Sequence, residues 1–379
     1  MGCPLYKNCG GCVNRQSDEK AYQQKKETEV RVLLEQNLGS LDGIWAKPIF
    51  LPDGTRRRAA FAFQVVKGKP ILGFNENKSH VLEDIQTCAM LTPKINEALA
   101  DLRELLIKLC SIKTNSLKKK KTVLQLSKGD LLVLEAENGL DVVLEADIDL
   151  GLQHRFEIAD FMTSHDLFVR FSFRKKHNMN AEPIVEKAKP FIKIGDTKVL
   201  IASGDFLQAS KQGQDALIEL VKKYVGDTSG KAADLFCGIG TFSYALADMK
   251  KMSVVAVDVS KSLLENFEHS IRAQMIQNIQ IKEQNLFLYP MTADELQGFN
   301  IIVFDPPRAG AKDQVEEFCK IDVSARPEKI IAVSCNPITF ARDAKILING
   351  GYCLKNITMV DQFVYSNHSE LVGLFTNEK

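Results

Sequence analysis

The chain has 379 residues, of which 45% are hydrophobic and 26% charged, and its formal net charge is +1 at pH 7. This composition excludes a disordered or low-complexity chain, and the length allows about two or three domains with cores of their own. No stretch approaches about 18 consecutive apolar residues, and the N-terminal residues lack the apolar segment of a signal peptide. We therefore expect a cytoplasmic protein without a membrane span.

The N-terminal segment is rich in cysteine and poor in apolar residues. Cys3, Cys9 and Cys12 lie there among glycines, and the chain has nine cysteines in all. An odd number without a secretion signal argues against a disulfide framework. Thiolates around a metal would order such a segment, with Cys88 as the candidate fourth ligand. Zinc and an iron–sulfur cluster both accept four thiolates, so the spacing leaves the metal open.

The first half of the chain alternates helices and short strands. Residues 18–38 predict an amphipathic helix that ends at Gly39, residues 44–90 predict strands, and residues 93–110 predict a second helix with Pro93 at its start. Alternating apolar residues on both sides of Asn138-Gly139 predict a β-hairpin. The lysine run Lys118 to Lys121 is typical of a solvated loop, with contact to phosphate as the alternative.

The second half of the chain has a different pattern. Continuously apolar strands at 232–236, 253–258, 300–305 and 329–334 alternate with helical segments. Parallel sheets covered on both faces have strands of this kind, so we expect a doubly wound α/β domain. The fold class is then α/β with a smaller, β-rich α+β region before it. We place the boundaries at 1–92, 93–200 and 201–379.

A glycine turn follows the first of these strands. Gly238 and Gly240 let the backbone approach a ligand at the start of a helix. Asp258 ends the next strand, where a carboxylate can bind a ribose hydroxyl. An adenosine-containing cofactor is expected, with NAD and S-adenosylmethionine both open, although Ser243 in place of a third glycine disfavours NAD. The alternative is a glycine turn that binds no ligand.

Three reactive side chains lie at or near other strand ends. Asp305 is followed by two prolines, which stiffen a loop at the carboxyl edge of the sheet. Cys335 ends another strand on this edge and is a candidate nucleophile, with simple packing as the alternative. Glu370 directly precedes the final strand and is a candidate base, with a surface carboxylate as the alternative.

Taken together, these motifs resemble the RNA uridine-5-methyltransferase family, whose members are class I enzymes that use S-adenosylmethionine. The matching segments occur in family order: the Cys3, Cys9, Cys12 and Cys88 set, Phe206-Leu207-Gln208, 234–242, 305–308, 334–337 and 361–370. The cysteine set resembles the branch that carries a 4Fe-4S cluster and acts mostly on 23S rRNA. Because the chain starts directly at the cysteines, it looks like the short form without a TRAM domain.

The resemblance implies roles for individual residues. Cys335 corresponds to the nucleophile that adds to uracil C6, and Glu370 to the base that removes the proton from C5 before β-elimination. The cofactor contacts implied are Gln208, Phe236, Gly238, Gly240, Asp258 and Asp305, and the cluster ligands are Cys3, Cys9, Cys12 and Cys88. It also implies an iron–sulfur segment at 1–92, an RNA-binding region at 93–200 and a Rossmann-like methyltransferase domain at 201–379. The target uridine has to leave its stack to reach such a site. We expect a monomer.

Four alternatives remain open from the sequence. The same chemistry could act on the T-loop uridine of tRNA, although the cysteine set disfavours this target. Asp-Pro-Pro loops also hold exocyclic amines in adenine and guanine N-methyltransferases, which need no thiol. The third alternative is a non-catalytic RNA-binding iron–sulfur protein, and the least favoured is a dehydrogenase.

Overall fold

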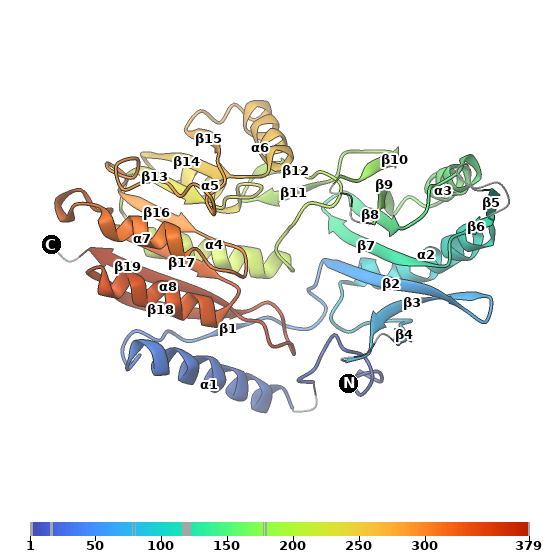
Figure 1. Ribbon diagram of the computed structural model, residues 1–379, viewed down its shortest axis with the longest axis horizontal. Coiled ribbons are helices and arrows are strands. Elements are labelled where there is room, and N and C mark those ends of the chain that lie inside the picture. The colour runs from blue at the N-terminus through green and yellow to red at the C-terminus, as the bar shows by residue number, and fades with distance from the viewer. Residues whose placement is uncertain are drawn as a thin grey trace. The chain divides into compact units, whose positions relative to one another are not determined.

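A computed structural model describes residues 3–15, 18–77, 79, 81–115, 123–176, 178 and 180–377. The chain forms two compact units (Figure 1). Unit 1 comprises Met1–Gln16, Pro52–Ile192 and Leu200–Lys211, and unit 2 comprises Ser17–Leu51, Lys193–Val199 and Gln212–Lys379. The functional division at residues 92 and 200 stays a prediction. The lysine run Lys118 to Lys121 lies outside the described residues.

Unit 2 is built on an eight-stranded sheet in the order β1-β18-β19-β17-β16-β13-β14-β15. Neighbouring strands are parallel except that β19 runs antiparallel between β17 and β18. The strands are β1 (Ile49–Phe50), β13 (Gly230–Leu235), β14 (Met252–Asp258), β15 (Ile279–Glu283), β16 (Ile301–Phe304), β17 (Lys329–Ser334), β18 (Tyr352–Asp361) and β19 (Glu370–Asn377). The expected doubly wound domain is confirmed.

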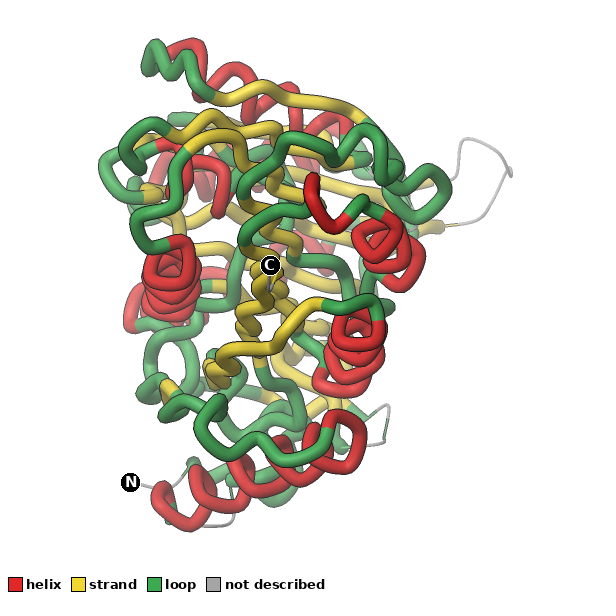
Figure 2. Tube along the Cα trace, turned by 90° about the vertical axis from the view of Figure 1, so that its left-hand side faces the viewer, coloured by secondary structure: helices red, strands yellow, loops and turns green. Residues whose placement is uncertain are grey.

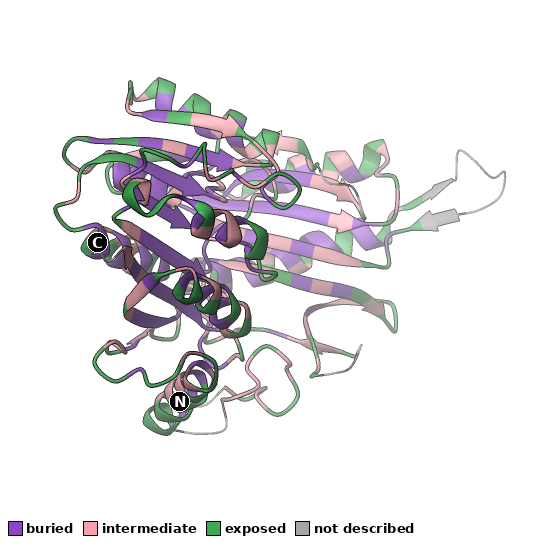
Figure 3. Cartoon of the chain, turned by 60° about the vertical axis from the view of Figure 1, so that its left-hand side comes forward, coloured by how far each residue is buried: buried purple, intermediate pink, exposed green. Residues whose placement is uncertain are grey.

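Helices cover both faces of this sheet, as Figure 2 shows. They are α1 (Glu19–Leu38), α4 (Lys211–Val225), α5 (Thr241–Ala247), α6 (Lys261–Ala273), α7 (Lys312–Lys320) and α8 (Pro337–Asn349), with a short 3₁₀ turn at Val323–Ala325. The central strands are buried on both sides (Figure 3), and all four residues of β16 lie in the core. This burial explains the continuous apolar runs in the sequence.

The N-terminal helix α1 belongs to unit 2. The Asp18 side chain caps it by accepting a hydrogen bond from the Ala21 amide (3.0 Å), and it ends at Gly39 with φ 88°. Val30 and Leu34 pack into the core of unit 2. The helix predicted at 18–38 is confirmed.

Unit 1 contains a seven-stranded sheet in the order β10-β9-β8-β7-β2-β3-β4. The strands are β2 (Arg58–Val66), β3 (Lys69–Asn75), β4 (Leu82–Asp84), β7 (Lys128–Ala136), β8 (Gly139–Ala146), β9 (Phe168–Lys175) and β10 (Glu182–Glu186). Within this sheet only β8 and β9 pair in parallel, and helix α3 (Leu152–Ser164) connects them. Helix α2 (Pro93–Ser111) buries its leucines against the sheet.

The predicted hairpin at Asn138-Gly139 is confirmed as β7 and β8. Gly139 has φ 142°, and a Cβ there would lie 2.6 Å from Val169, so glycine is required. Two further two-stranded ladders pair β5 (Lys113–Asn115) with β6 (Val123–Gln125) and β11 (Phe191–Ile194) with β12 (Thr197–Leu200). None of the helices in the described part of the chain has the length and apolar character needed to cross a bilayer.

Candidate functional site

The order of the strands in unit 2 creates a point where ligands bind in open α/β sheets. β13 lies between β14 and β16, so the chain leaves β13 toward one side of the sheet and returns at β16 on the other. A crevice forms outside the carboxyl ends of two such strands. The turn after β13 and Asp305 after β16 therefore share this edge, as the sequence predicts.

The glycine turn after β13 has a strained backbone. Phe236, Gly238 and Gly240 all have positive φ, at 61°, 55° and 88°. A Cβ at Gly240 would lie 2.4 Å from the Phe267 ring, whereas a Cβ at Gly238 would meet no atom within 4 Å. The left-handed conformation of Phe236 is uncommon for a residue with a side chain, and such strain concentrates at ligand sites. The space beside Gly238 is therefore open, and the predicted role of this glycine in cofactor binding stays a prediction.

Asp258 joins this turn to the end of β14. Its Oδ2 accepts a hydrogen bond from the Gly238 amide and its Oδ1 accepts one from the Ser260 amide, each at 2.9 Å. Each carboxylate oxygen keeps a further lone pair that can accept from a ribose hydroxyl. The sequence analysis did not single out Phe287, which follows β15. Its ring lies 5.3 Å from that of Phe236 and is half-exposed, and the exposed run Phe287-Leu288-Tyr289 was the available signal.

Asp234, the acid at the end of β13, is completely buried. Its Oδ2 accepts a hydrogen bond from Ser243 Oγ (2.5 Å), and within the described residues its Oδ1 has no partner. Burial raises the pKa of Asp234 to about 7 although the Ser243 hydroxyl lowers it, and Asp305 and Asp258 raise it further. Burial also raises the pKa of Asp305 to about 7. Burial at this edge therefore makes both carboxyl groups bind their protons more tightly than a solvated aspartate does.

Cys335 and Glu370 come together because β19 is inserted beside β17. The last pair of this antiparallel ladder joins Ser334 to Leu371, so the next residues, Cys335 and Glu370, face each other. Burial raises the pKa of Cys335 to about 11, with further increases from Glu370 and Asp305, while Arg308 lowers it. Burial likewise raises the pKa of Glu370 to about 8, with Asp305 adding to the increase. The Gln362 amide donates to Glu370 Oε1 at 3.0 Å.

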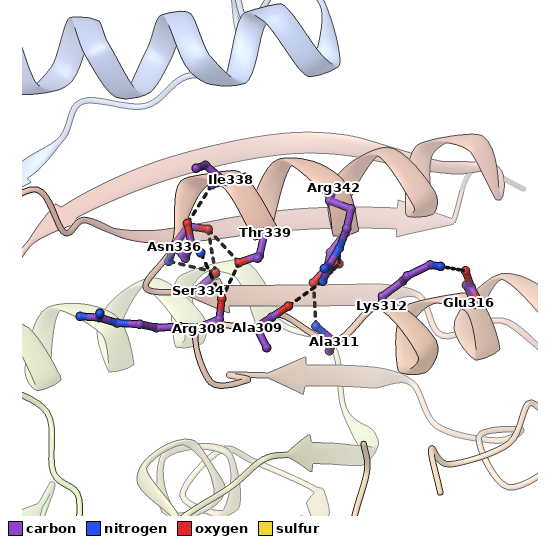
Figure 4. Close-up of polar contacts among 11 residues, drawn as sticks. Arg308, Ala309, Ala311, Lys312, Glu316, Ser334, Asn336, Ile338, Thr339 and Arg342 are labelled. Atoms are coloured by element: carbon purple, nitrogen blue, oxygen red, sulfur yellow. Dashed lines mark hydrogen bonds and ion pairs between the residues drawn. The ribbon is translucent and has the colours of Figure 1, made fainter. Parts of the chain in front are cut away.

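The loop after Asp305 is tied to the segment after Cys335 (Figure 4). The Arg308 carbonyl accepts hydrogen bonds from Asn336 Nδ2 (3.1 Å) and Thr339 Oγ1 (3.3 Å). Asn336 also caps α8, because its Oδ1 accepts from the Ile338 amide at 3.1 Å. These bonds fasten the loop at 305–308 to the segment that directly follows Cys335.

The four cysteines expected to bind a metal lie in unit 1. Cys3, Cys9, Cys12 and Cys88 all line one cavity of about 440 Å³. Among the described residues, no three His, Cys, Asp or Glu side chains form a group that could hold a metal ion. The structure thus brings the cysteines to one cavity without gathering three of them around a single point.

Gln208 also belongs to unit 1. Its carbonyl accepts a hydrogen bond from Arg57 Nε (3.1 Å), and the neighbouring Leu207 carbonyl accepts from Arg58 Nη1 (2.8 Å). The Arg58 guanidinium also covers the exposed Phe206 ring at 4.7 Å. The sequence analysis did not single out either arginine, although the run Arg56-Arg57-Arg58 is visible in the sequence.

The sheet order of unit 2 and the site at its switch point define a methyltransferase of the Rossmann-like class. A family model described as tRNA (Uracil-5-)-methyltransferase matches residues 172–379. An uncharacterized RNA methyltransferase of Brucella suis is 34% identical over 99% of this chain and 83% of its own length. The chain belongs to the RNA uracil-5-methyltransferase family, and it is an enzyme that uses S-adenosylmethionine.

Two further proteins are similar over nearly the whole chain. The 23S rRNA (uracil(1939)-C(5))-methyltransferase of Photorhabdus laumondii is 28% identical over 99% of this chain and 82% of its own length. The crystal structure of the Pyrococcus abyssi tRNA (uracil-54, C5)-methyltransferase with S-adenosyl-L-homocysteine superposes with a TM-score of 0.72 at 22% identity, over 99% of this chain and 87% of that one. The latter likeness supports the fold.

Proposed function

We propose that this enzyme, acting as a monomer, methylates C5 of one uridine in 23S rRNA, with Cys335 as nucleophile and Glu370 as base. The observation that carries the mechanism is the position of Cys335 opposite Glu370 beside the switch point of the sheet. Two observations support 23S rRNA as the substrate: the similarity to the 23S rRNA methyltransferase of Photorhabdus laumondii and the four cysteines that line one cavity.

The mechanism follows from the weak nucleophilicity of uracil C5. Addition of the Cys335 thiolate to C6 makes C5 an enolate carbon, which can take a methyl group. S-adenosylmethionine supplies that methyl group when bound. Glu370 then accepts the remaining C5 hydrogen as a proton, the C5–H electron pair forms the C5=C6 bond, and the thiolate leaves C6. The positive charge of Arg308 favours the thiolate of Cys335.

The residues of the edge fit this cofactor. The space beside Gly238 admits a ligand, and Asp258 has lone pairs for the ribose. Phe236 and Phe287 offer aromatic faces to the adenine. Asp305 raises the pKa values of both Asp234 and Glu370, and a sulfonium cation bound nearby would relieve this repulsion. We also propose Gln208 as a cofactor contact.

The target RNA is tested by nucleoside mass spectrometry on separated 23S rRNA and tRNA from cells with and without the gene. We expect 5-methyluridine to disappear from 23S rRNA alone and to return when the gene is restored. Loss from tRNA alone would assign the T-loop uridine instead. An unchanged 5-methyluridine content in both RNAs would overturn the proposal of either target.

We further propose that Cys3, Cys9, Cys12 and Cys88 hold a 4Fe-4S cluster. Each iron of such a cluster takes one thiolate, so its ligands surround the cluster and need not converge on a single ion. This arrangement matches four cysteines that line one cavity without gathering around a point. No catalytic step requires the cluster.

Anaerobic reconstitution of the full chain with iron and sulfide tests this site. We expect about four iron and four sulfide ions per chain, with the visible absorption of a cluster. Cys12→Ser should lower both contents strongly, whereas Cys353→Ser, in β18 of unit 2, should leave them unchanged. If the chain binds zinc without sulfide, the site is a zinc site and the cluster proposal is wrong. Equal metal contents in Cys12→Ser and Cys353→Ser would rule out these cysteines as the ligands.

A further inference from the structure

Helix α1 carries a buried charge that the proposed reaction does not use. Lys26 Nζ lies 2.6 Å from Asp361 Oδ1, and the side chains of the pair are 6% and 0% exposed. The Tyr22 hydroxyl, one turn earlier, donates to Asp361 Oδ2 at 2.6 Å and accepts from Lys26 Nζ at 3.1 Å. A buried ion pair is weak evidence for stability, because desolvation offsets the attraction.

The same groups hold the segment between β18 and β19. Lys26 Nζ donates to the carbonyls of His368 (2.6 Å) and Phe363 (3.4 Å). The Tyr365 amide donates to the Tyr22 hydroxyl at 2.7 Å, and the two tyrosine rings lie 4.6 Å apart. Tyr365 has φ 60°, a conformation that is uncommon for a residue with a side chain. Three points of segment 363–368 are thus fastened to α1.

This fastened segment leads directly into the proposed active site. His368 Nε2 lies 2.9 Å from Arg308 Nη2, in the loop that follows Asp305. Glu370 comes two residues later, as the first residue of β19. Cys335, by contrast, follows β17, and its neighbour Asn336 is hydrogen-bonded to the Arg308 carbonyl. The α1 network therefore acts on the proposed base more directly than on the proposed nucleophile.

We propose that Lys26, Tyr22 and Asp361 are positioning residues, which hold segment 363–368 so that Glu370 lies within reach of the C5 proton. This inference rests on the proposed role of Glu370. When the network is broken, Cys335 still adds to C6 and C5 still receives its methyl group. Removal of the C5 proton is slowed, so the bond between Cys335 and C6 persists as a methylated protein–RNA adduct.

A single-turnover experiment with the full chain, S-adenosylmethionine and substrate RNA separates these steps. It measures methyl groups transferred to RNA, 5-methyluridine released, and adduct that survives denaturation. Tyr22→Phe removes one hydroxyl, and the double variant Lys26→Met/Asp361→Asn removes both charges together so that no buried charge is left unpaired. Lys25→Met is the control, because Lys25 lies on the same helix with its side chain 59% exposed.

We expect Tyr22→Phe and the double variant to slow adduct breakdown by about tenfold to a hundredfold, the effect of a small misplacement of a reacting group. Methyl transfer to RNA should stay close to that of Lys25→Met. If methyl transfer, product release and thermal stability fall together and no adduct accumulates, the network only stabilises the fold and the inference is overturned.

Glu370→Gln, measured in parallel, distinguishes this inference from the proposed function. If Glu370→Gln accumulates adduct and the network variants do not, the positioning role alone is wrong. If Glu370→Gln itself accumulates none, Glu370 is not the base and the positioning role fails with it.

Discussion

Cys335→Ala is expected to lower RNA methylation by about a thousandfold or more, because a missing nucleophile leaves only the contributions of binding and orientation. Binding of RNA and of S-adenosylmethionine should persist, since neither needs the thiol. The measurement is transfer of labelled methyl groups to substrate RNA, with equilibrium binding of both ligands as the companion assay.

Cys353→Ala is the matched control for this experiment, because Cys353 lies in β18 of the same unit, away from the strand ends that form the site. It should retain the wild-type rate. Full activity in Cys335→Ala would contradict the proposed mechanism and favour methylation of an exocyclic amine, a reaction that needs no thiol.

Glu370→Gln is expected to block product release while leaving the first half of the reaction intact. Glutamine keeps the size of the side chain but cannot accept the C5 proton, so methylated RNA should remain bound to Cys335. Denaturing electrophoresis with labelled methyl groups measures this adduct. Release of 5-methyluridine at the wild-type rate would show that another group accepts the proton.

The raised pKa of Glu370 predicts the direction of the pH dependence. Burial raises the pKa of Glu370 from 4.5 to about 8, and only the carboxylate can accept a proton, so adduct breakdown should accelerate as the pH rises through about 8 and level off above it. The folded state also holds this proton more tightly than the unfolded chain. The contribution of protonated Glu370 to the free energy of unfolding is complete below about pH 4.5 and is lost as the pH rises through about 8. Glu370→Gln should therefore lose less thermal stability than the wild type across this interval.

Several parts of the fold could be predicted because they depend on local patterns. The strands of unit 2 are buried on both faces, which leaves continuous apolar runs, and α1 has a cap and a buried stripe at helical spacing. The central hairpin follows from Gly139. In each case the signal lies within one segment, and neighbouring segments do not change it.

Lys26, a charged residue on the buried face of α1, could not be interpreted from the local sequence pattern. Tyr22, Lys26, Val30 and Leu34 are the buried residues of this helix, spaced four apart. The sequence indicates the apolar face through Val30 and Leu34, but a lysine on that face has no interpretation without its partner. Asp361 is distant in the chain, and only the packing of α1 within unit 2 brings Lys26 and Asp361 together.

The sequence by itself determined which chemical groups stand at the carboxyl ends of the strands, because parallel strands present their ends at one edge: Asp234, Asp258, Asp305 and Cys335. Only the tertiary structure decided that Glu370 faces Cys335. That pairing depends on the insertion of β19 between β17 and β18 in antiparallel register, and a shift of one residue would turn the side chain to the other face. Likewise, the spacing of Cys3, Cys9 and Cys12 is local, but Cys88 joins them through the fold of unit 1.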